Sequence, residues 1–167
     1  MTEKYKILIV DDESVVRQAF MRILSSERCT VEAVSNGPDA LVRMQQQRFD
    51  VVLLDLKMPG IDGMTVLRTI KACWPETEVI VVTGYAAIET AKQSVTLGAF
   101  DYMAKPVGPD EVVNVTNDAL LHKGWALHRE PPASDPSSEW ADSPLSVPPG
   151  AWAASPHDAT VYNRSPS

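Results

Sequence analysis

Cysteine, basic charge and long apolar runs are all scarce in this chain. Its 167 residues include two cysteines, Cys29 and Cys73, with no CxxC spacing, so neither a disulfide framework nor a zinc site is expected. Both thiols are expected to be reduced and buried. The first apolar run, at residues 6–10, is too short for a signal-peptide core or a membrane span. We therefore expect a cytoplasmic protein with no membrane insertion.

An excess of positive charge is also absent. The chain has 22 acidic and 15 basic residues, which gives a formal net charge of -7. Binding to a phosphate backbone depends on clustered Lys and Arg, so no direct contact with nucleic acid is expected. A hydrophobic fraction of 44% in a chain of this length is enough for one well-buried core. The composition therefore favours a single globular domain.

Periodic apolar patterning is missing after Glu130. Residues 131–167 contain 8 of the 13 prolines and are rich in serine, with no sustained helix or strand period. Such a segment buries too little apolar surface to offset the entropy lost on ordering. We expect a disordered Pro/Ser-rich tail there.

The earlier part of the chain alternates short apolar runs with stretches of helical periodicity. The runs lie at residues 6–10, 31–34, 50–54, 79–82 and 100–103. Unbroken β-branched runs are typical of parallel strands that are buried on both faces, and right-handed crossovers place helices on both sides of such a sheet. The pattern predicts an α/β fold, a doubly wound five-stranded parallel sheet with five helices.

The same periodicity predicts which helix faces pack on the sheet. The helix that opens at Ser14 is expected to direct inward Val15, Val16, Ala19, Ile23 and Leu24. The helix before Gly98 is expected to direct inward Ile88, Ala91, Val95 and Leu97.

Charged and hydroxyl residues follow four of the apolar runs directly. They are Asp11 and Asp12 after the first, Asp55 after the third, Thr83 after the fourth and Lys105 after the fifth. In open α/β sheets the ligand site lies beyond the carboxyl ends of the strands. We expect all five side chains to converge at one edge of the sheet.

These residues lie in four stretches that, in this order and spacing, resemble the receiver domain of two-component response regulators: ILIVDDE, VVLLDLKMPGIDG, VIVVTGYA and LGAFDYMAKP. The resemblance implies a flavodoxin-like sheet with strand order 2-1-3-4-5. It implies a receiver domain over residues 1–124, which leaves 125–167 as linker and tail. Details such as TGYAAIETA are similar to receivers of the nitrogen-regulation type.

The carboxylates also make chemical sense as a phosphoacceptor site. A carboxylate nucleophile can form a mixed anhydride with a phosphoryl group if the charge between the two anions is neutralised. Mg²⁺ (or Mn²⁺) does this with hard oxygen ligands. By resemblance, Asp55 is the phosphoacceptor, Asp12 a direct metal ligand and Asp11 a ligand through water. The backbone carbonyl of Lys57 is the remaining protein ligand that the resemblance implies.

The two residues that follow the last two apolar runs, Thr83 and Lys105, would act on the phosphoryl group. Lys105 supplies a positive charge beside Asp55, and Thr83 offers a hydroxyl donor. By resemblance, Pro106 follows a cis peptide bond that aims Lys105 inward, and Tyr102 is the aromatic residue that switches together with Thr83.

The resemblance implies a phosphoacceptor that turns over no substrate of its own, with a histidine kinase or a phosphotransfer protein as the donor. Its output would be a changed surface over the fourth helix, fifth strand and fifth helix, read by a downstream protein. We expect a stand-alone receiver, and the receiver of a truncated transcription regulator is the alternative. An aspartyl-nucleophile phosphohydrolase of the haloacid dehalogenase type would need an acid two residues after Asp55, where this chain has Lys57. A flavin binder would need a phosphate-cradling loop after the first strand, where the sequence is DDES.

Overall fold

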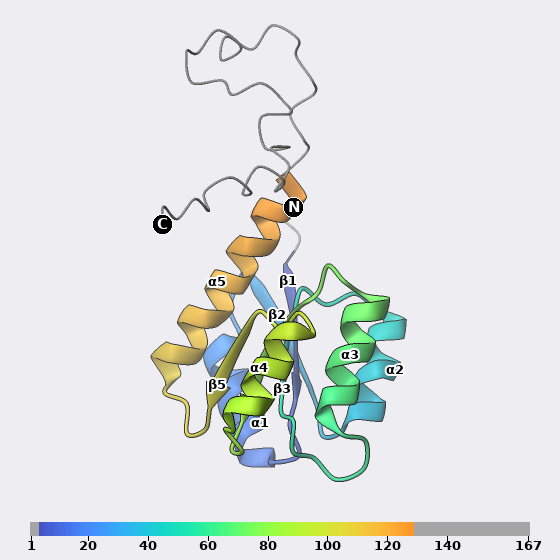
Figure 1. Cartoon of the computed structure of the whole chain (residues 1–167). Helices are drawn as coiled ribbons and strands as arrows, with labels where there is room; N and C mark the ends of the chain where they lie inside the picture. The colour runs from blue at the N-terminus through green and yellow to red at the C-terminus, as the bar shows by residue number, and fades with distance from the viewer. Residues whose placement is uncertain (1–3, 129–167) are drawn as a thin grey trace, which may run out of the picture. The chain divides into compact units, whose positions relative to one another are not determined.

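The structure is a computed structural model that describes residues 4–128. The chain forms five strands and five helices in strict alternation: β1 (Tyr5–Val10), α1 (Ser14–Leu24), β2 (Cys29–Val34), α2 (Gly37–Gln46), β3 (Val51–Leu54), α3 (Gly63–Cys73), β4 (Glu78–Thr83), α4 (Ile88–Thr96), β5 (Asp101–Ala104) and α5 (Pro109–His128). The strands form one parallel sheet in the order β2-β1-β3-β4-β5 (Figure 1). The predicted fold class and strand order are confirmed.

The register of the central strands determines which residues leave the sheet together. Val10 pairs with Leu54, so the residues that follow β1 and β3 emerge side by side. Thr83 pairs with Ala104, so Lys105 emerges next to the end of β4.

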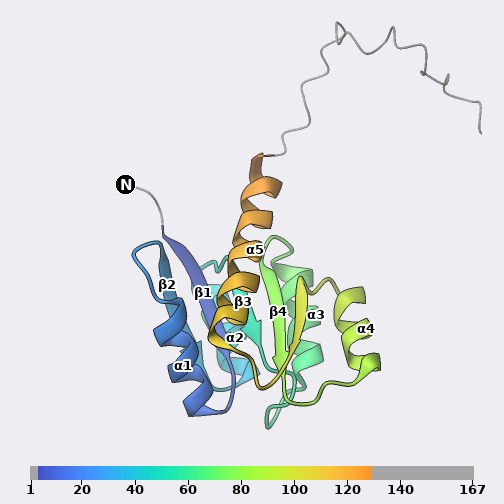
Figure 2. The same cartoon turned by 90° about the vertical axis from the view of Figure 1, so that its left-hand side faces the viewer.

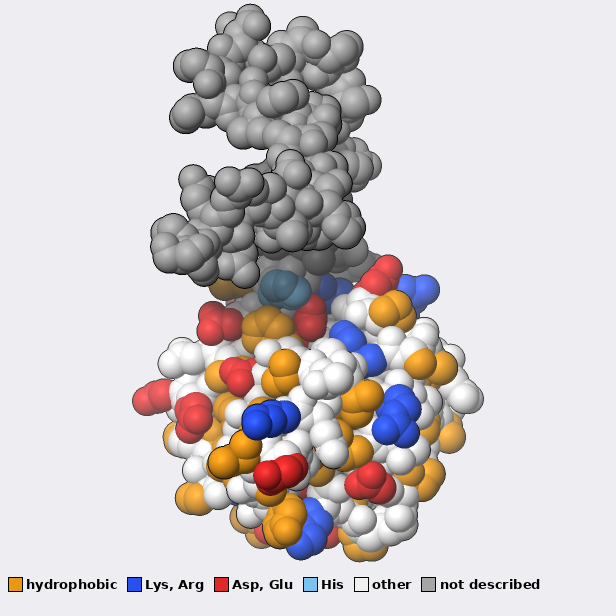
Figure 3. All heavy atoms as spheres, viewed as in Figure 1, with side chains coloured by type: hydrophobic (Ala, Val, Ile, Leu, Met, Phe, Trp, Pro, Cys, Tyr) orange, Lys and Arg blue, Asp and Glu red, His pale blue; other side chains and the backbone are white. Residues whose placement is uncertain are grey.

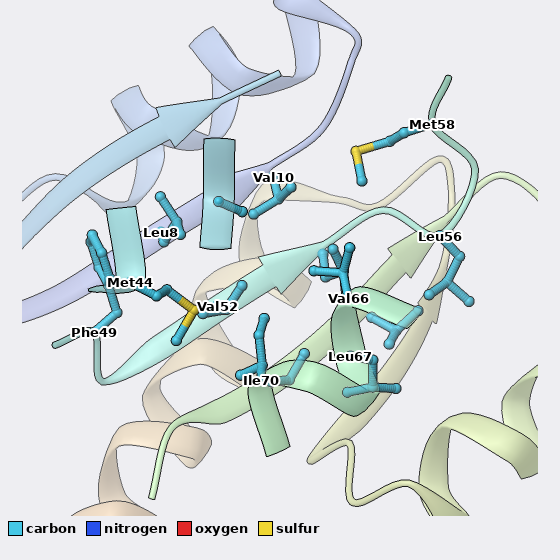
Figure 4. Close-up of a cluster of buried hydrophobic side chains, with 14 residues drawn as sticks. Leu8, Val10, Met44, Phe49, Val52, Leu56, Met58, Val66, Leu67 and Ile70 are labelled. Carbon is cyan, nitrogen blue, oxygen red and sulfur yellow. The ribbon is translucent and has the colours of Figure 1, made fainter. Parts of the chain in front are cut away.

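The sheet is covered on both faces, as the unbroken apolar strands require. Side chains alternate along each strand, so Leu8 and Val10 of β1 point to one face and Ile7 to the other. Figure 4 shows the first cluster, in which Met44 of α2 and Ile70 of α3 meet the strand side chains. The opposite cluster includes residues of α1 and α5, and Figure 2 shows these two helices on the same side of the sheet.

Local side-chain and backbone chemistry explains where α2 begins and where α4 ends. The Asn36 side chain accepts a hydrogen bond from the Asp39 backbone N–H at 2.8 Å, and Pro38 lies in the first turn of α2. After α4, Gly98 has a φ of 94°, the left-handed conformation that commonly ends a helix.

The predicted inward face of α1 is partly wrong. Val15 is 76% exposed, whereas Phe20 and Leu24 are buried. With half-buried Val16, these two residues follow the i, i+4, i+8 spacing of one helix face. Val15 lies about 100° away from that face because each residue turns the helix by that angle.

The predicted face of α4 is wrong at both of its β-branched residues. Ile88 and Val95 are 70% and 62% exposed, and Ser94 is the buried residue of the helix. The Ser94 hydroxyl donates to the Thr90 carbonyl at 2.8 Å, so its polar atom is satisfied within the helix. Its small side chain then allows close approach to Met64, whose sulfur lies 3.6 Å away.

The structure also bears on the expectations about the cysteines, the membrane and the end of the domain. Cys29 is half-buried and Cys73 is exposed, so the expectation of two buried thiols is wrong for Cys73. Among residues 4–128, no helix combines the length and the apolar character that crossing a bilayer requires. Helix α5 continues to His128, and the domain boundary at residue 124 stays a prediction. The predicted disordered tail lies outside the described residues.

Candidate functional site

Three carboxylates meet at the carboxyl edge of the sheet. Asp11, Asp12 and Asp55 each offer an oxygen, and these oxygens all lie within 4.8 Å of one another. Asp11 and Asp55 are buried, at 2% and 4% exposure, while Asp12 faces solvent. Hard oxygen donors at this separation fit a Mg²⁺ site in which water completes the coordination.

Lys105 enters the same cluster from the loop after β5. Its ammonium nitrogen lies 2.7 Å from Asp11, 2.9 Å from Glu13 and 3.2 Å from Asp55. The Lys105–Pro106 peptide bond is cis, which is the isomer that the resemblance implies. The structure therefore brings together four predicted residues from three distant parts of the sequence.

Burial and charge oppose each other in this cluster. Burial raises the pKa of the Asp11 carboxyl, and the hydrogen bond from Lys105 offsets this effect only in part. Burial also tends to lower the pKa of Lys105, but its hydrogen bonds to Asp11 and Glu13 outweigh burial and leave the pKa raised. Lys105 is thus held as a cation, and the carboxylates that surround it outnumber it.

Two residues of this region were missed in the sequence. Glu13 contributes an exposed carboxylate to Lys105, and its backbone N–H donates to an Asp11 oxygen at 2.9 Å. Arg17 donates to the backbone carbonyls of Asp11 and Asp12, at 2.8 and 2.9 Å, and so ties α1 to the loop that carries both acids. The third acid of the DDE run was a usable signal for Glu13. Arg17 gave none, because its partners are backbone atoms.

The loop after β3 presents Asp55. The Lys57 backbone N–H donates to an Asp55 carboxylate oxygen at 3.0 Å. Gly63 allows α3 to begin against this loop, since a Cβ at that position would lie 2.4 Å from the Leu56 Cα. The Lys57 side chain points elsewhere, with its ammonium 4.3 Å from the centre of the Tyr85 ring.

Thr83 and Tyr102 meet at the loop after β4. Thr83 is fully buried, and its hydroxyl oxygen accepts a hydrogen bond from the Tyr85 N–H at 3.3 Å. Tyr102 is half-buried against the α2–α3 side of the core, and its hydroxyl donates to the Tyr85 carbonyl at 3.1 Å. Burial raises the pKa of the Tyr102 phenol, and a backbone hydrogen bond at Ala87 offsets this in part.

Comparison with known proteins places this site in a family. Residues 7–117 match the family model described as the response regulator receiver domain. The chain belongs to the response regulator receiver family, and the resemblance seen in the four sequence stretches is confirmed.

Similar proteins include bacterial transcription regulators. The chain is 38% identical over 120 residues to regulatory protein AtoC of Escherichia coli K12, covering 72% of this chain and 26% of AtoC. It is 34% identical over 116 residues to the DNA-binding transcriptional regulator NtrC of Salmonella typhimurium LT2, covering 70% of this chain and 25% of NtrC. The chain therefore spans about a quarter of the length of these curated relatives.

Solved structures agree with the family. A CheY-like receiver domain protein from Methanospirillum hungatei JF-1 superposes with a TM-score of 0.72 at 29% identity, covering 74% of this chain and 99% of that one. NtrX from Brucella abortus gives a TM-score of 0.70 at 31% identity, covering 74% of this chain and 29% of that one.

Proposed function

We propose that Asp55 accepts a phosphoryl group from a histidine kinase or a phosphotransfer protein, and that the chain signals through the resulting change of shape. The observation that carries this proposal is the cluster around Asp55: a buried carboxylate with oxygens of two further carboxylates within 4.8 Å and the Lys105 ammonium 3.2 Å away. Members of the receiver family accept phosphate at such a site.

In the proposed step a carboxylate oxygen of Asp55 attacks phosphorus. The bond from phosphorus to the donor atom breaks, and the leaving group departs with the electron pair and takes up a proton from solvent. Asp11, Asp12, Asp55 and the Lys57 carbonyl would hold Mg²⁺ or Mn²⁺, which would supply neutralising charge for the approach of two anions. Lys105 keeps its positive charge next to Asp55 throughout, since its pKa is raised by the carboxylates around it.

The energy available from the product is large enough to drive a switch. A phosphoryl group adds about 1.5 to 2 negative charges and three acceptor oxygens. Hydrogen bonds to charged groups contribute about 1.5–3 kcal/mol each, so bonds from Thr83 and Lys105 would contribute about 3–6 kcal/mol. Reversing a two-state population from about 1:99 to 99:1 takes about 5.5 kcal/mol.

We further propose that α4, β5 and α5 form the output surface, read by a downstream protein. Tyr85, Ile88 and Val95 are 59%, 70% and 62% exposed, so apolar side chains are available on and beside α4. The face in Figure 3 shows acidic, basic and apolar side chains interspersed, with no broad basic patch among its described residues. Such a surface suits a protein partner better than a nucleic acid.

A second candidate is a receiver that regulates transcription as part of a longer polypeptide. Its support is that AtoC and NtrC are regulators, the latter described as DNA-binding, and that this chain matches about a quarter of each. Sequencing the gene on both sides of the coding region distinguishes this candidate from a stand-alone receiver. The phosphohydrolase alternative gains no support, because Lys57 occupies the position of the required second acid and its side chain lies over Tyr85.

The test is intact-mass measurement after incubation with acetyl phosphate. The wild-type chain should gain one phosphate when Mg²⁺ or Mn²⁺ is present and none in excess chelator. Asp55→Asn should gain none, whereas Asp62→Asn, which changes an exposed acid of the same loop, should behave like the wild type. Phosphate on Asp55→Asn, or unchanged labelling in chelator, would refute the proposal. Phosphotransfer profiling against the kinases of the source genome would then identify the donor.

A further inference from the structure

Tyr85 is in contact with three residues of the site, although it belongs to none of the groups discussed as reacting. Its backbone N–H donates to the Thr83 hydroxyl oxygen at 3.3 Å, and its carbonyl accepts from the Tyr102 hydroxyl at 3.1 Å. Its ring lies under the Lys57 ammonium, 4.3 Å from the nitrogen to the ring centre. The residue therefore links the loop after β4 to β5 and to the loop after β3.

The contact with Lys57 connects Tyr85 to the acceptor loop. Lys57 is two residues after Asp55, and its backbone N–H already donates to the Asp55 carboxylate. The Lys57 side chain then crosses to the next loop of the sheet edge, where it meets the Tyr85 ring. Lys57 thus contacts Asp55 through its backbone N–H and the loop after β4 through its side chain.

The Tyr85 carbonyl also accepts a hydrogen bond from the Ala87 N–H at 3.2 Å, but the chain on either side of Tyr85 is open to solvent. Gly84, Tyr85 and Ala86 are all exposed, and no atom lies within 4 Å of the place where a Cβ on Gly84 would be. The Tyr102 side chain packs against the α2–α3 side of the core, while its hydroxyl donates to this carbonyl at the exposed edge of the site. We call this position of Tyr102, packed on the core with its hydroxyl on the Tyr85 carbonyl, its inward arrangement, and a shift of the loop would remove the hydrogen bond that supports it.

We propose that the cation–π contact between Lys57 and Tyr85 is a positioning contact that holds the Tyr85 carbonyl within reach of Tyr102, and so favours the inward arrangement of Tyr102 before any phosphoryl group is present. The meaning of this arrangement for signalling rests on the proposed function, but the contact itself does not. A cation–π contact between exposed groups changes an equilibrium constant about two- to fivefold. The contact would therefore shift the equilibrium between the two arrangements of Tyr102 only slightly, and phosphorylation would produce the larger shift.

The experiment measures Tyr102 in the unphosphorylated full chain. Tyrosines are labelled with fluorine, the Tyr102 signal is assigned with Tyr102→Phe, and a neutral soluble paramagnetic chelate reports how much of the population exposes the ring. Lys57→Ala and Tyr85→Leu should each increase the ratio of outward to inward Tyr102 about two- to fivefold. The double variant should show no more than either single change, since both remove the same contact.

Matched variants separate this role from general effects. Lys57→Arg and Tyr85→Phe keep the cation and the ring, so both should retain the wild-type ratio. Lys92→Ala removes an exposed lysine of α4 and should also leave the ratio unchanged. Because Tyr85 is 59% exposed, its variants leave the core intact, and circular dichroism checks this.

An unchanged ratio in Lys57→Ala and Tyr85→Leu would overturn the proposal. So would an equal shift in Lys92→Ala, which would mean that net charge alone acts, or a shift in Tyr85→Phe as large as in Tyr85→Leu. The measurement uses neither phosphate nor a kinase. A failure here is therefore distinguishable from a failure of Asp55 to accept phosphate.

Discussion

Replacing Lys105 by Met should destabilise the protein strongly when no divalent cation is present. The methionine side chain fills most of the volume of the lysine stem, so the change removes chiefly the charge. In the wild type the ammonium lies 2.7 Å from Asp11 and 3.2 Å from Asp55, whose side chains are only 3% and 5% exposed. The variant leaves these two carboxylates buried next to each other with no cation.

The size of the effect follows from that burial. Removing one partner of a buried ion pair typically destabilises a protein by about 3–5 kcal/mol. The loss should lie at the lower end, about 3 kcal/mol, because Asp11 can escape its charge by binding a proton. Burial already raises the pKa of Asp11 in the presence of Lys105, and loss of the ammonium raises it further.

The pH dependence has a definite sign. A carboxyl whose pKa is higher in the folded than in the unfolded state binds more protons when folded, so acid favours folding. The lost stability of Lys105→Met should therefore be largest at neutral pH and should shrink as the pH falls through the raised pKa of Asp11. Mg²⁺ should also restore part of it, because a cation bound only by the folded state stabilises that state.

Urea denaturation followed by circular dichroism measures these quantities. The wild type, Lys105→Met and the exposed-lysine control Lys92→Met are compared at neutral and mildly acidic pH, with chelator and with Mg²⁺. Equal stability of Lys105→Met and wild type at neutral pH in chelator would refute the reasoning. So would a loss that neither acid nor Mg²⁺ reduces.

Three further outcomes are expected. Gly63→Ala should lower the free energy of unfolding by about 1–3 kcal/mol in urea denaturation, because its Cβ would overlap backbone atoms of the acceptor loop, while Gly108→Ala, with open space at that position, should change it little. Thr83→Ala should still take up phosphate on Asp55, but its phosphorylation-induced NMR shifts along α4 and β5 should be smaller than in the wild type; a full response would contradict the role of the hydroxyl. A chain that ends at Glu130 should keep its melting temperature within about 2 °C, as calorimetry can check, since a loss below about 0.5 kcal/mol shifts a domain of this size by no more than that.

Local signals in the sequence were sufficient for the strands, the helices and the position of most site residues, whereas the strand order came from the resemblance to receiver domains. Each buried strand is a short unbroken apolar run, and the residue that ends the run must leave the sheet at its carboxyl edge. At this edge, carboxylate oxygens of Asp11 and Asp55 lie 2.7 and 3.2 Å from the Lys105 ammonium nitrogen.

The tertiary structure alone decided how these residues are connected to their surroundings. Arg17 and Tyr85 act through contacts with backbone atoms or with side chains of another loop, and no spacing in the sequence indicates such partners. The inward face of α4 was also not predictable from apolar periodicity. Its packing depends on the small size of Ser94 and on a hydroxyl that is satisfied within the helix. Local patterns determine strands, helices and their ends, whereas the pairing of side chains from different loops is set only when the sheet brings those loops together.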